Sequence, residues 1–251
     1  MNTTIKVTGN SHEQEIVNRN NFYNLFKNSP IPQNEILQNL GLYMNRQALS
    51  RILFMHHIYQ EIINVHGIIA EFGVRWGQNL ALFESFRGIY EPYNYNRKII
   101  GFDTFEGFKS IDQNDGNNEI ITEGAYSVTE EYEGYLEEIL KHHENESPIS
   151  HMKKYELIKG NSITKIHEYL SENPQTIIAL AYFDFDIYKP TKECLQAILP
   201  YLTKGSVIGF DELNYNKFPG ETIALKEVLG LDKYRIRRLP ISPLQSYVII
   251  E

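Results

Sequence analysis

One stretch, residues 68–82, limits most strongly how this chain can fold. It begins as an apolar run, Ile68-Ile-Ala-Glu71-Phe, which is typical of a strand buried in a parallel sheet. It then breaks at Gly73 and Gly77 and continues with helical spacing from Leu80. A strand that breaks on glycines before a helix brings backbone N–H groups close to a ligand, because glycine carries no side chain that blocks the approach.

The acid at the end of this strand indicates the charge of the ligand. Glu71 lies two residues before the first glycine. A carboxylate at that place repels a phosphate and favours a ligand that carries a positive charge. The chain also contains no G-x-G-x-x-G, which argues against a nicotinamide-dependent oxidoreductase.

Further apolar runs predict the rest of the sheet. Strands are expected at residues 98–103, 155–160, 177–186 and 206–211, with two closing strands near 234–239 and 245–251. Helical patterns separate most of them, so we predict an α/β fold of the Rossmann-like kind, with a mostly parallel sheet and helices on both faces. Two helices, near 36–42 and 49–63, are expected before the first strand.

The chain is expected to divide at the start of the first strand. Residues 1–66 would form an N-terminal arm with helices that acts as a lid or as a wall of an acceptor pocket. Residues 67–251 would form the catalytic domain, with a polar, lid-like insertion at about 109–150. The polar, Asn-rich residues 1–30 are interpreted as a loosely held arm or a contact in a homo-oligomer.

Composition narrows the class of protein. The 251 residues carry a formal net charge of −8 and no long basic cluster, which argues against nucleic acid as a partner. The single cysteine, Cys194, lies among apolar residues and is interpreted as a small core residue. No secretory signal and no apolar run of membrane-spanning length occurs, so we expect a cytoplasmic protein without a membrane partner.

Polar side chains gather where the predicted strands end. They are Glu71, Asp103, Asn161, Asp184, Asp186, Asp211 and Glu212. Ligands of open parallel sheets bind outside the carboxyl ends of the strands, so these side chains are expected to meet there. The first three strands would surround a nucleoside-like ligand. An acid at the end of the second strand, here Asp103, is the usual partner of ribose hydroxyls.

The acids of the next two strands suggest metal chemistry. Paired carboxylates on neighbouring strand ends suit a hard cation such as Mg²⁺, which would lower the pKa of a bound hydroxyl. A nearby acid could then take the proton. Alternatively, one or two of these acids cap the following helices, and Asp186 is the foremost candidate because Tyr188-Lys-Pro-Thr191 starts a helix just after it.

Four motifs in this order resemble the S-adenosylmethionine-dependent sugar O-methyltransferases typified by the macrocin and mycinamicin enzymes. Glu71-Phe-Gly-Val-Arg-Trp-Gly77 is similar to the E-x-G-V-x-x-G stretch of that family, and Asp103-Thr-Phe-Glu-Gly107 to its D-S-F-x-G stretch. Asp184-Phe-Asp-Ile-Tyr-Lys-Pro-Thr191 is similar to its D-x-D-x-Y-x-x-T. Asp211-Glu212 stands where the family carries Asp-Asp. The resemblance implies a class I methyltransferase fold with a seven-stranded sheet whose last strand runs antiparallel.

The resemblance also implies a cofactor and its site. S-adenosylmethionine would be bound with Glu71 and the glycines around its methionine part and with Asp103 on its ribose. The expected cofactor-binding residues are Glu71, Phe72, Gly73, Gly77, Asn79, Asp103, Thr104, Phe105, Gly160, Asn161, Ser162 and Asp184. A magnesium ion would lie on Asp184, Asp211 and Glu212, and a sugar hydroxyl would be the acceptor. Asp184 or Asp186 is the expected catalytic base, with a histidine of the N-terminal helices as the alternative.

Other functions stay open at the level of sequence. The enzyme could methylate a nitrogen or a phosphate-type acceptor without a metal, or the chain could be a non-catalytic binding protein on the same fold. The sugar could be carried by a nucleotide or by a glycosylated small molecule. Four basic residues could attract an anionic acceptor locally despite the negative net charge: Arg46, Arg75, Lys109 and Lys217.

Overall fold

The computed structural model describes residues 11–251, which divide after Arg51 into two compact units, the second being Ile52–Glu251. The first unit holds helices α1 (Glu13–Lys27) and α2 (Gln33–Ile36), the 3₁₀ helix η1 (Leu37–Tyr43) and the start of α3 (Arg46–Ile62). No residue of α1, α2 or η1 is buried. Helix α1 was not predicted, because an exposed helix rich in asparagine has no apolar stripe to reveal it.

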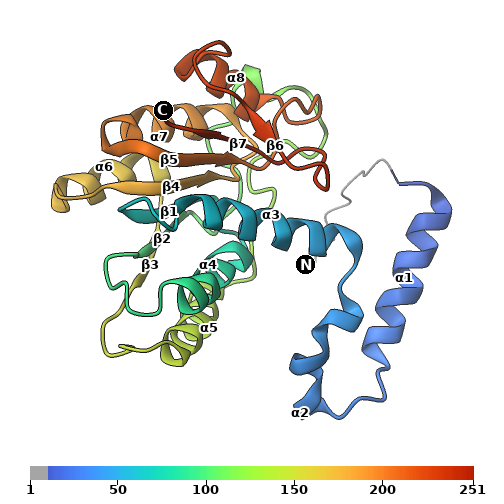
Figure 1. Cartoon of the computed structure of the whole chain (residues 1–251). Helices are drawn as coiled ribbons and strands as arrows, with labels where there is room; N and C mark the ends of the chain where they lie inside the picture. Colours follow the sequence, from blue (N-terminus) through green and yellow to red (C-terminus); the bar gives the residue numbers. More distant parts are fainter. Residues whose placement is uncertain (1–10) are drawn as a thin grey trace. The chain divides into compact units, whose positions relative to one another are not determined.

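The second unit is built on one sheet of seven strands (Figure 1). The strands are β1 (Ile68–Phe72), β2 (Ile99–Asp103), β3 (Tyr155–Lys159), β4 (Ile178–Phe183), β5 (Leu202–Phe210), β6 (Arg237–Arg238) and β7 (Ser246–Ile249). Their order is β3-β2-β1-β4-β5-β7-β6, and β7 runs antiparallel to β5 and β6. The predicted α/β sheet with an antiparallel last strand is therefore confirmed.

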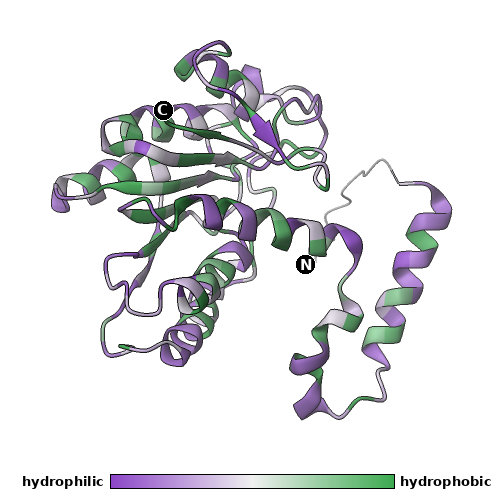
Figure 2. Cartoon of the chain, viewed as in Figure 1, coloured by the Kyte–Doolittle hydropathy of each residue, from purple (hydrophilic) through white to green (hydrophobic). Residues whose placement is uncertain are grey.

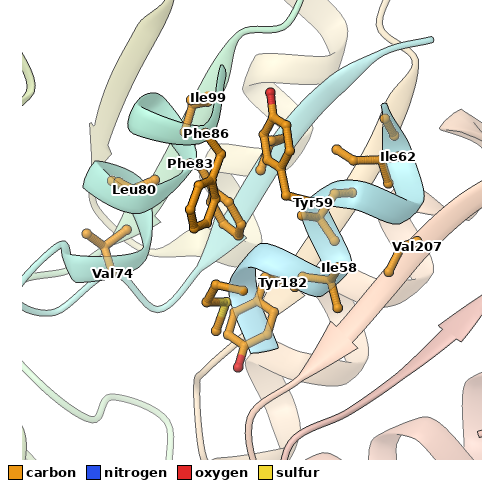
Figure 3. Close-up of a cluster of buried hydrophobic side chains, with 14 of the residues drawn as sticks. Ile58, Tyr59, Ile62, Val74, Leu80, Phe83, Phe86, Ile99, Tyr182 and Val207 are labelled. Carbon is orange, nitrogen blue, oxygen red and sulfur yellow. The ribbon is translucent and has the colours of Figure 1, made fainter. Parts of the chain in front are cut away.

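Helices cover both faces of this sheet. They are α4 (Gln78–Tyr90), α5 (Tyr132–Glu146), α6 (Ser162–Glu172), α7 (Tyr188–Ile198) and α8 (Gly220–Val228), with short 3₁₀ helices η2 (Gln113–Asp115) and η3 (Leu199–Tyr201). On one face, α3, α4 and α5 pack around Tyr59, Phe83 and Tyr182 (Figure 3). On the other, α6, α7 and α8 pack around Phe183 and Leu195. The central strands are mostly hydrophobic, as burial on both faces requires (Figure 2).

Four phenylalanines form a row across the carboxyl ends of the central strands. Phe72 stacks on Phe102 and on Phe183, with ring centroids 5.1 and 4.8 Å apart, and Phe183 stacks on Phe210 at 5.5 Å. The strand register places these residues directly opposite one another. The row gives the strand ends a rigid apolar layer, and the polar residues that follow each strand lie just beyond it.

The start of one strand differs from the sequence prediction, and the burial of the single cysteine agrees with it. The fifth strand was expected over residues 206–211, but β5 begins at Leu202, which pairs with Ile178 ahead of a register shift. Cys194 is a core residue with no exposed surface, as expected. Among the described helices, none combines the length and the apolar character needed to cross a membrane.

Candidate active site

The loop after β1 is held in place by the strands on both sides. Gly73 adopts φ +94°, and a Cβ atom there would lie 2.1 Å from the carbonyl oxygen of Asp184 at the end of β4. Gly77 adopts φ +75° at the start of α4, where a Cβ would collide with Leu136 of α5. Both positions therefore favour glycine by backbone conformation and by space.

Glu71 is fully buried at the base of this loop. Its Oε1 accepts a hydrogen bond of 2.7 Å from Nδ2 of Asn79, a buried residue in the first turn of α4. A buried carboxylate requires such partners because its desolvation is costly. The pair fixes the direction of the Glu71 carboxyl group close to the glycine loop.

Asp103 joins the loop after β1 to the loop after β2. Its Oδ2 accepts hydrogen bonds from the backbone N–H groups of Val74, at 2.6 Å, and Arg75, at 2.7 Å. Its Oδ1 accepts one from Phe105 at 2.6 Å. Each carboxylate oxygen has two acceptor sites, so these bonds leave one site, on Oδ1, for a ligand hydroxyl. The structure thus gives Asp103 a positioning role that the sequence did not reveal.

The remaining residues expected around a nucleoside lie at the ends of β2 and β3. Thr104 donates to the carbonyl oxygen of Gly107 and accepts from Glu106 N–H, both at 3.1 Å, and so shapes the turn after β2. Gly160 donates its N–H to the carbonyl oxygen of Asp103 at 2.8 Å. Asn161 caps α6 by accepting from Ile163 N–H at 3.0 Å, and Ser162 is buried in the first turn.

Five carboxylates gather at the ends of β4 and β5. Asp184 and Asp186 follow β4, Asp211 and Glu212 follow β5, and Glu221 stands in the first turn of α8. Burial, followed by the charges of the other four acids, raises the pKa of Asp186 well above its ordinary value. Burial, followed by the charges of Asp184 and Asp211, raises the pKa of Glu221 well above the ordinary range. The acids of the two strands are therefore brought together, as the sequence predicted.

Glu221 was missed at the level of sequence. It has no exposed surface, and its Oε1 accepts hydrogen bonds from the N–H groups of Phe185 and Asp186 at 3.1 and 3.2 Å. Its Oε2 accepts from Glu212 N–H at 3.1 Å. This side chain thus ties the loop after β4 to the loop after β5. An acid in the first turn of a helix is common enough that its position alone gave no signal.

The alternative that Asp186 caps α7 is wrong. The N–H of Tyr188, at the start of α7, donates to Oδ1 of Asp115, which lies in the polar loop after β2. Asp186 instead adopts a left-handed φ of +62° and turns the chain between β4 and α7. Asp211, the first acid after β5, accepts hydrogen bonds from Tyr182 OH at 2.6 Å and Gln245 Nε2 at 2.8 Å. Within the described residues, no group of three or more His, Cys, Asp or Glu side chains is arranged so that it could hold a metal ion.

The sheet order, the acid-and-glycine loop after β1 and the acids after β4 and β5 define a class I methyltransferase. Comparison with solved structures agrees. The chain is 43% identical to the calicheamicin methyltransferase CalS11, with 96% of this chain and 94% of that chain covered and a TM-score of 0.93. It is 41% identical to the apo structure of the same enzyme, described as a TDP-rhamnose 3′-O-methyltransferase, with 96% of each chain covered and a TM-score of 0.84.

The chain therefore belongs to the family of S-adenosylmethionine-dependent sugar O-methyltransferases, as its motifs indicated. Being an O-methyltransferase, it is neither an oxidoreductase nor a non-catalytic binding protein. The O-methyltransferase NovP, 16% identical over 80% of this chain and 79% of that chain with a TM-score of 0.56, shares the fold. No protein-family model matches the chain, and no curated protein is similar enough to match it.

Proposed function

We propose that this enzyme transfers the methyl group of S-adenosylmethionine to a hydroxyl group of a sugar carried by a nucleoside diphosphate. The observation that carries the proposal is the convergence, at one edge of the sheet, of the loop between Glu71 and Gly77 with the acids that follow β4 and β5. The substrate named for CalS11, TDP-rhamnose, supports the choice of a nucleotide sugar over a glycosylated small molecule.

The cofactor's sulfonium would lie near the glycine loop. When bound, the cofactor supplies an electrophilic methyl group on a positively charged sulfur. Glu71, held by Asn79, would complement that charge, and the remaining acceptor site of Asp103 would take a ribose hydroxyl. The lining of the cofactor site would be completed by Phe72, Gly73, Gly77, Thr104, Phe105, Gly160, Asn161, Ser162 and Asp184.

The acids after β4 and β5 would organise the acceptor. Carboxylate oxygens are the ligands that a hard cation prefers, and the mutual repulsion of these acids is a reason for one to bind. We propose that Asp184, Asp211 and Glu212 hold Mg²⁺, which supplies polarisation of a sugar hydroxyl, and that these side chains become a ligand group when the cation arrives. Asp184 or Asp186 would take the proton of that hydroxyl. Positioning would supply much of the rate, because methyl transfer needs an in-line approach of oxygen to carbon.

The first experiment is calorimetric titration with S-adenosylhomocysteine, with and without Mg²⁺ and with NADH as the control ligand. We expect micromolar binding of S-adenosylhomocysteine and none of NADH. Turnover is then measured with TDP-rhamnose and, separately, with an alkyl rhamnoside. Transfer to the rhamnoside alone would replace the nucleotide sugar by a glycoside, and transfer to neither would reject both acceptors.

The metal is tested by Asp211→Asn together with removal of divalent cations by EDTA. Asparagine keeps the side-chain oxygen that accepts from Tyr182 and Gln245, so the loop should keep its shape. We expect both treatments to abolish turnover while the affinity for S-adenosylhomocysteine stays within a few-fold. Full activity in EDTA would exclude the metal, and an equal loss of cofactor affinity would show that the cofactor and acceptor sites are not separate.

A further inference from the structure

Arg75 is held in an unusual conformation between the two glycines of the loop after β1. Its φ is +47°, in the left-handed region that residues other than glycine rarely adopt. Its N–H donates to Asp103 Oδ2 at 2.7 Å, which keeps the backbone in that state. The direction of the side chain is thus set by the same contact that joins the loops after β1 and β2.

The guanidinium of Arg75 stacks on Tyr126. Its Cζ lies 4.5 Å from the centre of the Tyr126 ring, well within the range of a cation–π contact. The ring is itself held by an edge contact with Phe108 at 5.2 Å and a tilted contact with Phe218 at 6.4 Å. A guanidinium that stacks on a fixed ring presents its N–H groups at its edge, in the geometry that suits a bidentate oxyanion.

The loop that carries Tyr126 is tied back to the turn after β2. Phe108 N–H donates to the carbonyl oxygen of Ala125 at 2.9 Å, and Gly124 N–H donates to that of Phe108 at 3.0 Å. A Cβ on Gly107 would lie 2.2 Å from the same Ala125 oxygen, so the two segments are in close backbone contact. The segment that carries Tyr126, on which Arg75 stacks, is therefore held in place by backbone contacts with the turn after β2.

Arg75 has no ion-pair partner among residues 11–251, although acids lie nearby. Its Nε atom is buried and makes no hydrogen bond within the same residues. A buried donor without an acceptor is unfavourable, so the protein alone does not satisfy the hydrogen-bonding groups of this guanidinium. The Arg75 guanidinium is thus a fixed, positively charged hydrogen-bond donor that an anion could contact.

The position of Tyr126 shows on which side of the site the Arg75 guanidinium lies, which is the side proposed for the sugar acceptor. Burial and then the charges of Asp186, Glu212 and Asp184 raise the pKa of Tyr126, while Arg75 lowers it. The ring therefore lies beside the acids that we propose to organise the acceptor. The ribose side of the cofactor, at Asp103 and Asn161, lies at the ends of β2 and β3.

We propose that Arg75, stacked on Tyr126, binds the diphosphate of the nucleotide sugar and so selects this acceptor over a sugar without phosphate. The inference rests on the proposed function. It adds a specificity-determining residue and explains how a chain with a net charge of −8 can bind an anionic substrate beside five carboxylates. Tyr126 acts as a positioning residue, since its ring fixes the plane of the guanidinium.

The test compares binding of TDP, thymidine and S-adenosylhomocysteine to the full chain by calorimetry. For Arg75→Gln we expect TDP affinity to fall about 10- to 100-fold, as loss of charge-assisted hydrogen bonds predicts. Thymidine and S-adenosylhomocysteine should bind as to the wild type. Tyr126→Phe keeps the ring and should keep TDP affinity, whereas Tyr126→Leu should lower it. Lys204→Gln, which removes an exposed positive charge at the start of β5, is the matched control and should change nothing.

Any of three other results would overturn the proposal that Arg75 binds the diphosphate. Unchanged TDP affinity in Arg75→Gln would show that another group binds the diphosphate. An equal loss of S-adenosylhomocysteine affinity would assign Arg75 to the cofactor's carboxylate. Failure of TDP to bind the wild-type enzyme would leave no diphosphate for Arg75 to recognise. The proposed methyl transfer is judged separately, because turnover of wild-type enzyme on either rhamnose acceptor does not depend on the Arg75 variants.

Discussion

Gly73, at the end of β1, lies so close to the backbone of Asp184, at the end of β4, that no side chain fits between them. A Cβ atom on Gly73 would stand 2.1 Å from the Asp184 carbonyl oxygen, and Asp184 N–H donates to the carbonyl oxygen of Phe72 at 2.8 Å. The two motifs that we assign to the cofactor and to the acceptor are therefore in direct backbone contact. A change at Gly73 should disturb both functions together.

We predict that Gly73→Ala destabilises the protein by about 2 kcal/mol or more, because the methyl group meets backbone and the φ of +94° is strained for alanine. Urea unfolding measures the loss. The control is Gly134→Ala in α5, where a Cβ meets nothing within 4 Å. This variant should gain about 0.5–1 kcal/mol, since alanine favours a helix. Equal stability of the two variants would contradict the close approach of Gly73 to the Asp184 backbone.

Because of Glu84 on α4, we expect the free energy of unfolding to fall as pH rises. Its side chain is 1% exposed, and neither oxygen has a hydrogen-bond partner among the described residues. Burial raises its pKa from 4.5 to about 8, with Glu144 and Glu137 of α5 adding to the rise and Arg87 and Lys154 opposing it. Between pH 4.5 and 8 the folded state keeps a proton that the unfolded state has released. Stability should therefore decrease across this window by on the order of 1.4 kcal/mol per pH unit for this group.

Glu84→Gln should remove this dependence, because glutamine stays neutral. We expect the variant to match the wild type near pH 4.5 and to exceed it by up to several kcal/mol at pH 8. Denaturant unfolding at a series of pH values measures the difference. Glu138→Gln, an exposed position of α5, serves as the control and should run parallel to the wild type. If the stability of Glu84→Gln also ran parallel to that of the wild type across this pH range, the pKa of Glu84 would not be raised in the folded protein.

Glu221 should matter more for turnover than for cofactor binding. It holds three backbone N–H groups from the loops after β4 and β5, and alanine would leave all three without their acceptor. We expect Glu221→Ala to lower kcat at least tenfold and to cost about 2 kcal/mol of stability, with little change in affinity for S-adenosylhomocysteine. Glu221→Gln should be milder, because its carbonyl oxygen can still accept. Glu172→Ala, at an exposed end of α6, controls for loss of a negative charge. An unchanged kcat in Glu221→Ala would remove the positioning role.

The sequence predicted those parts of the fold that local pattern dictates. Strands such as Ile178–Phe183 are unbroken apolar runs, which only a central, covered strand explains. Helix α1 escaped prediction because it buries nothing. The start of β5 at Leu202 was not predicted because it depends on pairing with Ile178, a tertiary contact.

In the site, too, the positions of residues along the strands could be predicted from local pattern, whereas their tertiary contacts could not. The motifs placed Glu71, Asp184 and Asp211 at strand ends, where the structure has them. What joins these ends could not be predicted, since it depends on contacts between residues far apart in sequence. The cap of α7 comes from Asp115, 73 residues before Tyr188, and the partner of the Arg75 guanidinium is the ring of Tyr126. Such contacts leave no periodicity or spacing in the sequence.

The buried pair of Glu71 and Asn79 provides a last prediction. Asn79→Asp replaces the amide that donates at 2.7 Å by a second carboxylate of the same shape. Two carboxylates at this distance repel each other, so we expect a loss of about 2 kcal/mol or more of stability at neutral pH. Affinity for S-adenosylhomocysteine should fall as well, because Glu71 would lose its orientation. Gln78→Glu, which adds the same charge at the exposed neighbouring position, is the control. If both variants were equally stable, the hydrogen bond between Asn79 and Glu71 would not orient the carboxylate in solution.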